Sequence, residues 1–399
     1  MRPYSSPSEP GRAAGAGLFD GILARGAVPA AVADDAWVRA MLDVESALAA
    51  ANAAAGVIPA AAGEAIVSAC VELAPDPADL GRAAAAHATP VVPLVAAIRA
   101  ALPAPVGEFV HAGATSQDVL DTAAMLVTGR ALTALLSDLD AAADAAAGLA
   151  TTHRDTPMVG RTLLRQAVPT TFGLTAAGWL TGLDAAAEGL RGYQPAAQLG
   201  GAAGTLAGLG AAGPAVFADF ARRLGLGAPE LPWHTERSRI GRLAGALGVA
   251  AGALGKPARD ITLLAQNEVG EVEEASPGRS SAMAHKHNPV AAVSTLAATA
   301  QAPGLVATLL ASAVQEHQRG AGAWQAEWRP LRELLVTVGS AAAWLRAGLT
   351  GLVVHADVMR ANLDRAGWHT ERGATDPMGS AGHFVDLALA RYASRRTDG

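Results

Sequence analysis

The sequence predicts an all-α protein built on a long central helical bundle, with small helical parts at both ends. Three observations support this fold class: alanine is the dominant residue type, aromatic residues make up only 4% of the chain, and alternating β-branched runs are scarce. Alanine has the highest helix propensity, and half-buried strands would show an alternating pattern that is missing here. We therefore expect helix almost throughout.

The N-terminal part, residues 1–110, is predicted to be a small helical domain behind a loose tail. Residues 1–17 are rich in proline, serine and glycine, which is typical of a chain end without fixed structure. Asp34 or Asp35 can cap a helix that runs to about Ala55, because a glycine and a proline follow shortly after it.

The central part, residues 111–355, has the strongest bundle pattern. No proline occurs from Gln117 to about His153, and apolar residues recur at every seventh position from Met125 to Ala146. This spacing predicts one very long helix with an apolar seam, as in helical bundles. Further helical tracts are expected at about 168–192, 235–273, 290–318 and 327–350.

Two segments lack a helical pattern. Residues 196–213 are rich in alanine and glycine, which either let helices approach closely or form a loop. In the C-terminal part, residues 356–399, the stretch 366–382 is rich in glycine and polar residues and indicates a loop. A short helix, at about residues 381–392, is expected to close the chain.

Charge, hydropathy and cysteine content narrow the function classes. A net charge of −6 and a pI near 5.9 give no electrostatic reason to bind nucleic acid or an anionic membrane. The apolar stretch 290–314 contains polar residues and Pro303, so we expect a buried helix or helix pair and not a membrane span. The single cysteine, Cys70, is expected to be a buried structural thiol. Without a secretory pattern at the N-terminus, these features predict a cytoplasmic protein.

The first segment that could carry chemistry, residues 111–118, directly precedes the longest helix. Thr115 and Ser116 place hydroxyl and backbone N–H groups at a helix N-terminus, where unpaired donors and the helix dipole favour a carboxylate. An ordinary helix cap explains the same two residues.

The second segment, residues 160–173, joins two long helices and carries two arginines, and taken alone it is expected to be a structural turn.

The third segment, residues 278–289, is a loop of small residues that holds two hydroxyls, an ammonium and an amide. They belong to Ser280, Ser281, Lys286 and Asn288. A serine that acts as a base needs a depressed pKa, which a nearby cation and backbone dipoles can provide. A solvated surface loop is the alternative, and composition alone does not separate the two.

Together, in this order and spacing, the three segments resemble the signature regions of the fumarase/aspartase superfamily. The third is the most specific, because it is similar to the superfamily loop Gly-Ser-Ser-x-Met-Pro-x-Lys-x-Asn-Pro. The resemblance covers residues 19–391 approximately and implies helical subunits in a homotetramer, with each active site drawn from three subunits. The matched loop positions are Ser280, Ser281, Met283, Lys286, Asn288 and Pro289.

The resemblance also implies roles for individual residues. Ser280 would exchange a proton with the carbon next to a substrate carboxylate, while Lys286 and Asn288 would hold carboxylate and stabilise the developing charge. Thr115 and Ser116 would bind carboxylate oxygens of a small di- or tricarboxylate substrate. No metal or organic cofactor is required. Further substrate-binding residues expected from the resemblance are Gln117, Gln166, Ser281 and Met283.

Two histidines complete the expected site. His111 precedes the Thr115–Ser116 turn and is counted with the catalytic residues, either orienting Ser280 or binding a carboxylate. His87 lies where the superfamily has another substrate-facing segment, and a substrate-binding role is weighed equally against a structural one.

The second segment distinguishes branches of the superfamily. Fumarases, argininosuccinate lyases and adenylosuccinate lyases carry a histidine directly after the Arg/Tyr-Thr pair, and this chain has Leu163 there. That histidine helps hydroxide or an amine to leave with a proton, which leucine cannot do. A lactonising enzyme forms its C–O bond with a carboxylate, which is stable without a proton at neutral pH. Leu163 therefore favours the cycloisomerase branch over a lyase.

Similarity to the cycloisomerase branch implies an intramolecular carboxylate addition. One carboxylate of 3-carboxy-cis,cis-muconate would close a lactone, with Ser280 as candidate proton donor, to give 4-carboxymuconolactone in the protocatechuate branch of the β-ketoadipate pathway. The alternatives are an adenylosuccinate- or argininosuccinate-type lyase and a non-catalytic helical oligomer. Arg279, Ala284 and His287 depart from the common loop and leave the exact substrate open. The C-terminal region is also shorter than in superfamily members.

Overall fold

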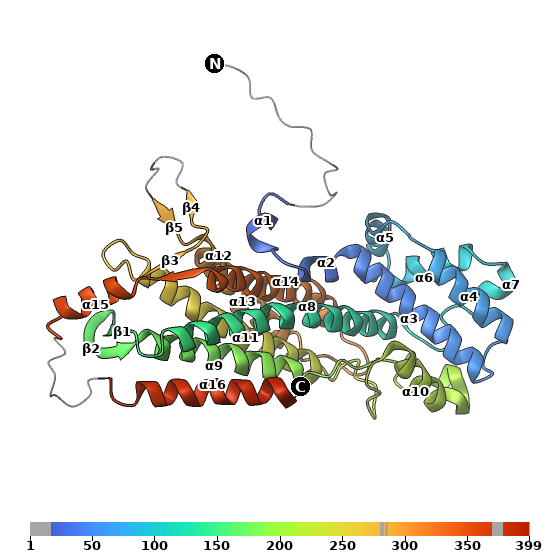
Figure 1. The fold of residues 1–399 in the computed structure, drawn as a ribbon. Coiled ribbons are helices and arrows are strands. Elements are labelled where there is room, and N and C mark those ends of the chain that lie inside the picture. The colour runs from blue at the N-terminus through green and yellow to red at the C-terminus, as the bar shows by residue number, and fades with distance from the viewer. Residues whose placement is uncertain (1–16, 280–282, 284–285, 369–377, 399) are drawn as a thin grey trace, which may run out of the picture.

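The structure is a computed structural model that describes residues 17–279, 283, 286–368 and 378–398. Long helices lie side by side in an elongated bundle, and shorter helices gather at one end of it (Figure 1). Within the described residues, the named strands form three two-stranded sheets at the margins of the bundle. The predicted all-α fold around a long helical bundle is confirmed.

The central helix α8 (Ser116–Thr152) organises the bundle. It has 37 residues and is about 55 Å long, at about 1.5 Å per residue. The predicted seven-residue seam is buried, since Met125, Leu132, Leu139 and Ala146 are all in the core. Burying this seam between neighbouring helices stabilises the bundle through the hydrophobic effect. The helices that pack most extensively against α8 are α3 (Asp34–Ala54), α9 (Phe172–Arg191) and α14 (Ala323–Thr350).

Three more helices complete the bundle: α11 (Ser238–Leu264), α12 (Val290–Thr299) and α13 (Ala302–Ala311). The last two are the helix pair expected from the apolar stretch 290–314. Pro303 lies in the first turn of α13, where a proline sacrifices no intrahelical hydrogen bond, so a new helix can start there. The stretches Ser116–Thr152 and Val290–Ala311 are long and apolar enough to span a membrane. Inside the protein, 67% of the apolar window of the first is buried but only 33% of the second, so the expected burial of the helix pair is incomplete.

The N-terminal helices include α3, which was predicted from Asp34 or Asp35 to about Ala55. Its extent is confirmed, but the predicted aspartate cap is wrong. The N-cap is Ala33, without a side-chain cap, and the Asp34 carboxylate instead pairs with Arg332 on α14. The other N-terminal helices are α1 (Asp20–Leu23), α2 (Val28–Ala31), α4 (Ala60–Glu72), α5 (Pro77–Ala84), α6 (Val91–Ala100) and α7 (Ala104–Gly107).

Cys70 on α4 is the buried thiol that the sequence predicts. Its side chain has no solvent access. Burial raises the pKa of the thiol to about 12, and the neighbouring Glu45 charge adds to this shift. A thiol with so high a pKa stays protonated at neutral pH and is a poor nucleophile, which supports a structural role.

The C-terminal region adds the helices α15 (Ala356–Arg365) and α16 (Ala381–Asp398). Helix α16 is longer than the predicted helix, which was expected to end near Tyr392. It lies along α9, and the Tyr392 hydroxyl donates to Asp144 of α8 at 2.7 Å while Arg395 donates to Asp184 of α9 at 2.7 Å. The predicted division of the chain into three parts stays a prediction.

Three predicted helical tracts are shorter than expected. The tract 168–192 begins as a strand and becomes helical only at Phe172, and the tract 235–273 ends at Leu264. The tract 290–318 ends at Ala311. Residues 196–213, which either pack closely or form a loop by sequence, are an irregular loop. This loop contains the 3₁₀ helix η1 (Ala207–Ala212) and leads into α10 (Gly213–Leu224).

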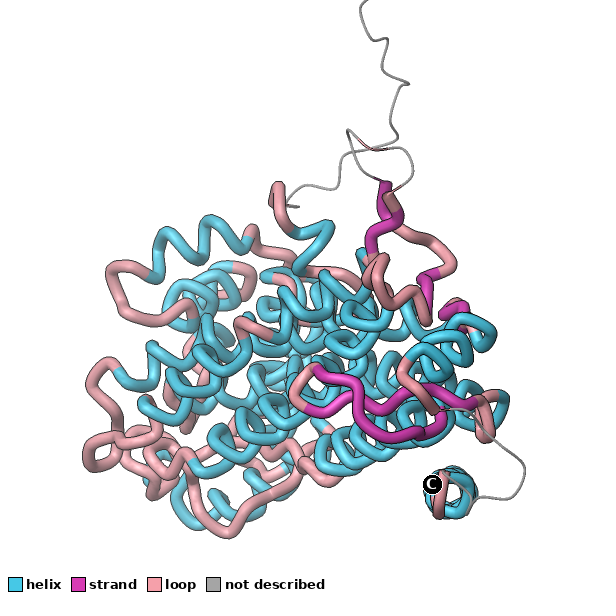
Figure 2. Tube along the Cα trace, turned by 90° about the vertical axis from the view of Figure 1, so that its left-hand side faces the viewer, coloured by secondary structure: helices cyan, strands magenta, loops and turns pink. Residues whose placement is uncertain are grey.

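The strands form antiparallel pairs: β1 (Pro157–Thr162) with β2 (Arg165–Thr171), β3 (Val272–Glu274) with β6 (Leu352–Val354), and β4 (Gly278–Arg279) with β5 (His287–Asn288). The β1–β2 hairpin stands where a structural turn was predicted for residues 160–173. It lies at the end of the bundle opposite the N-terminal helices, and the β4–β5 hairpin projects from the side (Figure 1). Figure 2 shows β4 and β5 at the top, standing away from the helices.

Candidate active site

The first predicted segment is the turn that leads into α8. Thr115 is the N-cap: its backbone N–H donates to the Asp118 carboxylate at 2.9 Å, and its hydroxyl accepts from the N–H of Asp118, which is a capping box. The ordinary cap considered for Thr115 is therefore present. Ser116 is the first helical residue and is partly exposed, so its hydroxyl and the N–H groups of the first turn can meet an anion.

Asp118 fixes this turn to a distant loop. Its Oδ1 accepts from the N–H of Gly200 at 2.9 Å and lies 2.7 Å from Nε2 of His234, and its Oδ2 accepts from the N–H of Gly201 at 2.9 Å. Asp118 and His234 are both buried. A buried carboxylate needs such partners, so the start of α8 has a single defined position. In the sequence these partners are more than eighty residues apart, and no local pattern joins them.

Gln117, predicted to bind substrate, is buried and its amide is bonded on both sides. Its Nε2 donates to the His234 carbonyl at 2.8 Å and to Asp121 at 3.1 Å, and its Oε1 accepts from Arg319 at 3.0 Å. Arg319 also donates to two loop carbonyls, so a guanidinium lies next to the first segment. Substrate binding by Gln117 stays a prediction. In this arrangement its amide positions Arg319, a candidate site residue that the motif pattern did not single out.

A buried ionic network lies beside the first segment. Arg237 donates to Asp121 of α8 at 2.7 Å and to Glu327 of α14 at 3.0 Å, and Trp324 donates to Asp121 at 3.0 Å. Burial raises the pKa of Glu327, while the hydrogen bond and charge of Arg237 oppose this shift. The network links three bundle helices and makes a rigid base for the turn before α8.

The two predicted histidines differ in their surroundings. His87 is exposed in the turn between α5 and α6. His111 is mostly buried, and its Nδ1 lies 2.6 Å from Oε1 of Glu45 on α3. The structure thus places His111 in the first segment with a carboxylate partner that no sequence motif contains.

The second segment is the β1–β2 hairpin, with Leu163 and Leu164 at its tip. Leu163 is 97% exposed, and the two leucines have φ angles of 50° and 64°. Such angles are strained for a bulky side chain and suit Asn-Gly in tight hairpins. Gln166 is exposed on β2 opposite Arg161, whose guanidinium makes a two-point ion pair with the buried Glu271 at 2.7 and 2.9 Å.

The third segment is the β4–β5 hairpin. Ser280 and Ser281 lie outside the described residues. Met283 and Lys286 are exposed, and the N–H of Lys286 donates to the Met283 carbonyl at 3.1 Å. Asn288 donates to the Gly278 carbonyl at 3.4 Å across the hairpin. In the part of the chain that is described, no group of three or more His, Cys, Asp or Glu side chains is arranged to hold a metal ion.

The first and second segments lie far apart in one chain. The first ends at Ser116, where α8 begins, and the second lies in the hairpin that follows the end of α8 at Thr152. The helix between them is about 55 Å long. Figure 1 shows the hairpin and the N-terminal helices at opposite ends of the bundle. A single subunit therefore does not bring the two segments into one site.

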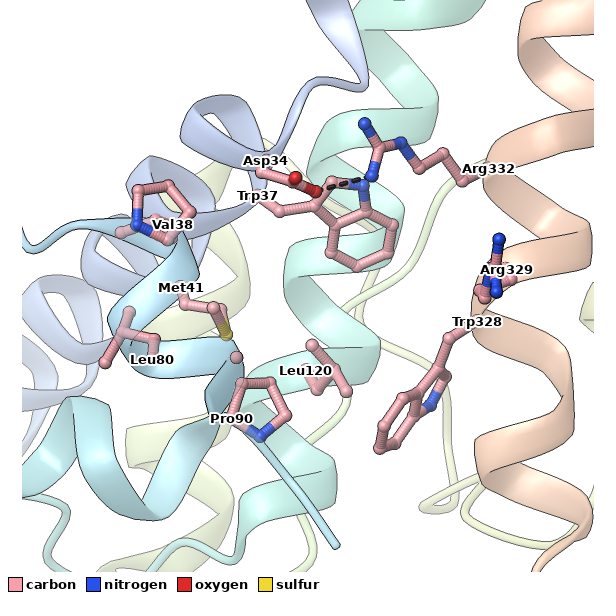
Figure 3. Close-up of a pocket in the computed structure, with 12 residues that line it drawn as sticks. Asp34, Trp37, Val38, Met41, Leu80, Pro90, Leu120, Trp328, Arg329 and Arg332 are labelled. Atoms are coloured by element: carbon pink, nitrogen blue, oxygen red, sulfur yellow. Dashed lines mark hydrogen bonds and ion pairs between the residues drawn. The ribbon is translucent and has the colours of Figure 1, made fainter. Parts of the chain in front are cut away.

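A separate apolar pocket lies between α3, α5, α8 and α14 (Figure 3). Trp37, Met41, Leu120 and Trp328 line it, and the pair of Asp34 and Arg332 lies at its side. Its lining includes none of the residues predicted for the site. Arg329 also lines the pocket, and the indole N–H groups of Trp37 and Trp328 have no hydrogen-bond partner among the described residues.

Comparison with known proteins defines the class. The family model described as Lyase matches residues 26–304, which is more than half of the chain. The chain therefore belongs to this lyase family, within the fumarase/aspartase superfamily, as its three segments predict. The helical bundle fits this assignment.

Relatives within the family carry different activities in their names. A 3-carboxy-cis,cis-muconate cycloisomerase from Pseudomonas aeruginosa is 44% identical over 387 residues, covering 95% of this chain and 82% of the relative. A nitrosuccinate lyase from Streptomyces davaonensis is 46% identical over 367 residues, covering 88% of this chain and 77% of the relative. The crystal structure of a 3-carboxy-cis,cis-muconate lactonizing enzyme from Pseudomonas putida matches with a TM-score of 0.87 and 34% identity, covering 94% of this chain and 99% of that one. The predicted similarity to the cycloisomerase branch is confirmed.

Proposed function

We propose that this protein is a cycloisomerase that converts 3-carboxy-cis,cis-muconate to 4-carboxymuconolactone in the β-ketoadipate pathway. The observation that carries the proposal is Leu163, which stands at the exposed hairpin tip where lyases that expel hydroxide or an amine have a histidine. An apolar tip supplies no proton to a leaving group, and a reaction that uses a carboxylate needs none. The cycloisomerase relative, 44% identical along nearly the whole chain, supports the same substrate.

The proposed chemistry is a balanced addition across a double bond. A substrate carboxylate oxygen bonds to one carbon of the diene and closes a five-membered lactone, and the electron pair of that double bond moves toward the neighbouring carboxylate. The adjacent carbon then takes a proton from Ser280. Lys286 and Asn288, with donors at the start of α8, stabilise the charge that develops on the substrate. These roles follow from the match to the superfamily loop.

The site is proposed to be composite, in a homotetramer. The roughly 55 Å helix between the first and second segments supports this proposal, because it keeps the two segments of one chain apart. The strained Leu163–Leu164 tip is largely exposed, which suits insertion into a neighbouring subunit. Helices α11, α12 and α13 expose large apolar side chains that a second copy could cover. Examples are Val249, Val293 and Leu310.

A nitrosuccinate lyase activity is the second candidate, because a relative with that name is 46% identical. Elimination from nitrosuccinate could release nitrite, which is a stable anion, as a carboxylate is. Leu163 disfavours only leaving groups that need a proton, so it does not separate these two candidates. It does count against an adenylosuccinate- or argininosuccinate-type lyase, and the intact Ser280, Lys286 and Asn288 count against a non-catalytic oligomer.

Substrate assays test the proposal. Purified protein is mixed with 3-carboxy-cis,cis-muconate and the loss of diene absorbance is followed, with nitrosuccinate (nitrite release) and adenylosuccinate in parallel. We expect the muconate to be consumed, and Ser280→Ala to lose about a thousandfold or more in kcat. Nitrite release without muconate turnover would replace the proposal with the second candidate. Turnover of adenylosuccinate alone would show that the argument from Leu163 is wrong.

A cytoplasmic location is part of the proposal. The chain has one cysteine, and Cys70 is a buried free thiol. A buried free thiol is compatible with the reducing conditions of the cytoplasm, where stabilisation by disulfides is rare.

A further inference from the structure

His111 and Glu45 form a pair that no motif of the sequence contains. Nδ1 of His111 lies 2.6 Å from Oε1 of Glu45, whose side chain has no solvent access. A contact this short, in so buried a place, is a strong charge-assisted hydrogen bond. Because Nδ1 faces a carboxylate, it carries a proton. In the described part of the protein Nε2 has no hydrogen-bond partner, and the His111 side chain is 17% exposed, so Nε2 is left to meet a ligand.

The backbone also holds His111 in a defined and strained position. Its φ of 67° lies in the left-handed region, which is uncommon for a residue other than glycine. Asn52, two helical turns after Glu45 on α3, donates to the Ala112 carbonyl at 3.0 Å. Gly113 follows at φ 79°, and a side chain there would collide with Leu209. Helix α3 therefore holds this turn through two hydrogen bonds, one between Glu45 and the His111 ring and one from Asn52 to the main chain of Ala112.

The charges around the ring favour its protonated form. Burial by itself lowers the pKa of His111, but the charge and hydrogen bond of Glu45 and the charge of Asp118 on α8 oppose this, and the pKa is raised overall. Arg99 on α6 acts against the protonated form. The Cys70 thiol on α4, on which the Glu45 charge acts, is neutral, and Arg39 and Asp43 on α3 act on that thiol with opposite signs.

We propose that Glu45 is a positioning residue for the reaction: it holds Nδ1 of His111, so that the ring stays a cation and presents Nε2–H to a substrate carboxylate beside Ser116. This inference rests on the proposed function and deepens it, because it assigns His111 to carboxylate binding and gives it an essential buried partner. The left-handed backbone at His111, only five residues before Ser116, keeps the ring in the same turn that leads into α8.

The test compares Glu45→Gln with the wild type in two independent measurements. The amide keeps the size of the carboxylate and removes its charge. In NMR titrations without substrate, with His111→Gln used to assign the ring signal, the His111 pKa should fall in Glu45→Gln. In assays with 3-carboxy-cis,cis-muconate, KM of Glu45→Gln should rise about tenfold or more near pH 8, with a smaller change in kcat. The difference should shrink once the pH falls below the His111 pKa that the titration gives for Glu45→Gln, because both rings are then protonated.

Asp43→Asn is the matched control. Asp43 lies on the same helix, and its carboxylate pairs with Arg39 and Arg130 at the surface. This variant should leave the His111 titration and the pH profile of KM unchanged. Circular dichroism checks that each variant is folded. Should Glu45→Gln fail to fold, titration of the wild type still decides the matter, because a His111 pKa at or below its ordinary value overturns the proposal.

The outcomes separate this inference from the proposed function. An unchanged His111 titration in Glu45→Gln, or a loss of activity that is equal at all pH values, overturns the role of Glu45 even if the muconate is a good substrate. Failure of the wild type to consume the muconate contradicts the proposed function, while the substrate-free titration remains a valid test of the pair.

Discussion

The two ends of α8 are built in opposite ways. At its start, near Ser116, charged and polar groups from distant parts of the chain are buried and paired, with Asp118, Asp121 and Arg237 at the centre. After its end, the β1–β2 hairpin exposes two strained leucines that contact little of their own chain. The polar groups at the start of α8 are held in place by partners in the same chain, whereas the hairpin tip after its end is exposed. The difference supports the proposal that each end of α8 contributes part of a site that is completed between subunits.

The largest expected effect comes from breaking the network at the start of α8. Arg237→Met leaves Asp121 and Glu327 buried without their cation, which should lower the free energy of unfolding by about 3–5 kcal/mol. Chemical denaturation measures this loss. Arg242→Met, on the exposed side of α11, is the control and should cost less than about 0.5 kcal/mol. Equal losses would mean that the network does not stabilise this end.

A change at the hairpin tip should lower activity without lowering stability. The double variant Leu163→Asn with Leu164→Gly gives the turn the residues that its φ angles favour and removes the apolar tip. We expect an unchanged or slightly raised melting temperature and a loss of about tenfold or more in kcat/KM. Unchanged activity would show that the hairpin tip is not part of an active site, and that the exposed leucines after α8 have no role in catalysis.

The raised pKa of His111 should make the free energy of unfolding depend on pH. A histidine whose pKa is raised in the folded state binds its proton more tightly there, so it stabilises the fold below its unfolded pKa. This stabilisation is lost as the pH rises through the folded value. The free energy of unfolding of the wild type, relative to His111→Gln, should therefore decrease between about pH 6 and about pH 8. A difference that is constant over this range would contradict the raised pKa.

The smallest expected effect concerns the β4–β5 hairpin. His287 departs from the common superfamily loop, and its Nδ1 lies 2.6 Å from the Glu273 carboxylate, with both side chains partly exposed. Because exposed ion pairs contribute little, His287→Ala should lower kcat/KM only by about twofold to fivefold, and His287→Arg should restore it. Loss of all activity in His287→Ala would show that this residue contacts substrate and does not merely hold the hairpin.

The long helices could be predicted because their apolar positions repeat within the sequence. Met125 to Ala146 show the seam directly, and its burial follows from helical geometry. The β1–β2 hairpin was missed, since its tip is Leu163–Leu164 instead of the glycine or asparagine that usually marks such turns. Local pattern therefore predicts the helices well and fails where the backbone adopts a conformation that its residues do not favour.

Some residues of the candidate site could be predicted from local motifs, and others could not. The three segments could be found from their residues and order, and the loop around Lys286 pointed to the superfamily. Glu45, Asp118 and Arg319 acquire their roles only through tertiary packing, because their partners lie far away in the sequence. Gln117 shows the limit of a motif: the residue type fits substrate binding, and its amide is bonded inside the subunit.

Subunit complementation tests the composite site most directly. Two variants are each assayed alone: Ser280→Ala, which lacks the proposed proton donor, and the double variant at the hairpin tip, Leu163→Asn with Leu164→Gly. The two are then mixed, dissociated and reassembled together. If a site takes the hairpin from one subunit and the serine from another, random mixing leaves about a quarter of the sites with both wild-type parts. We predict that the mixture recovers about that fraction of wild-type muconate turnover, while no more activity than the average of the two separate variants would contradict the composite site.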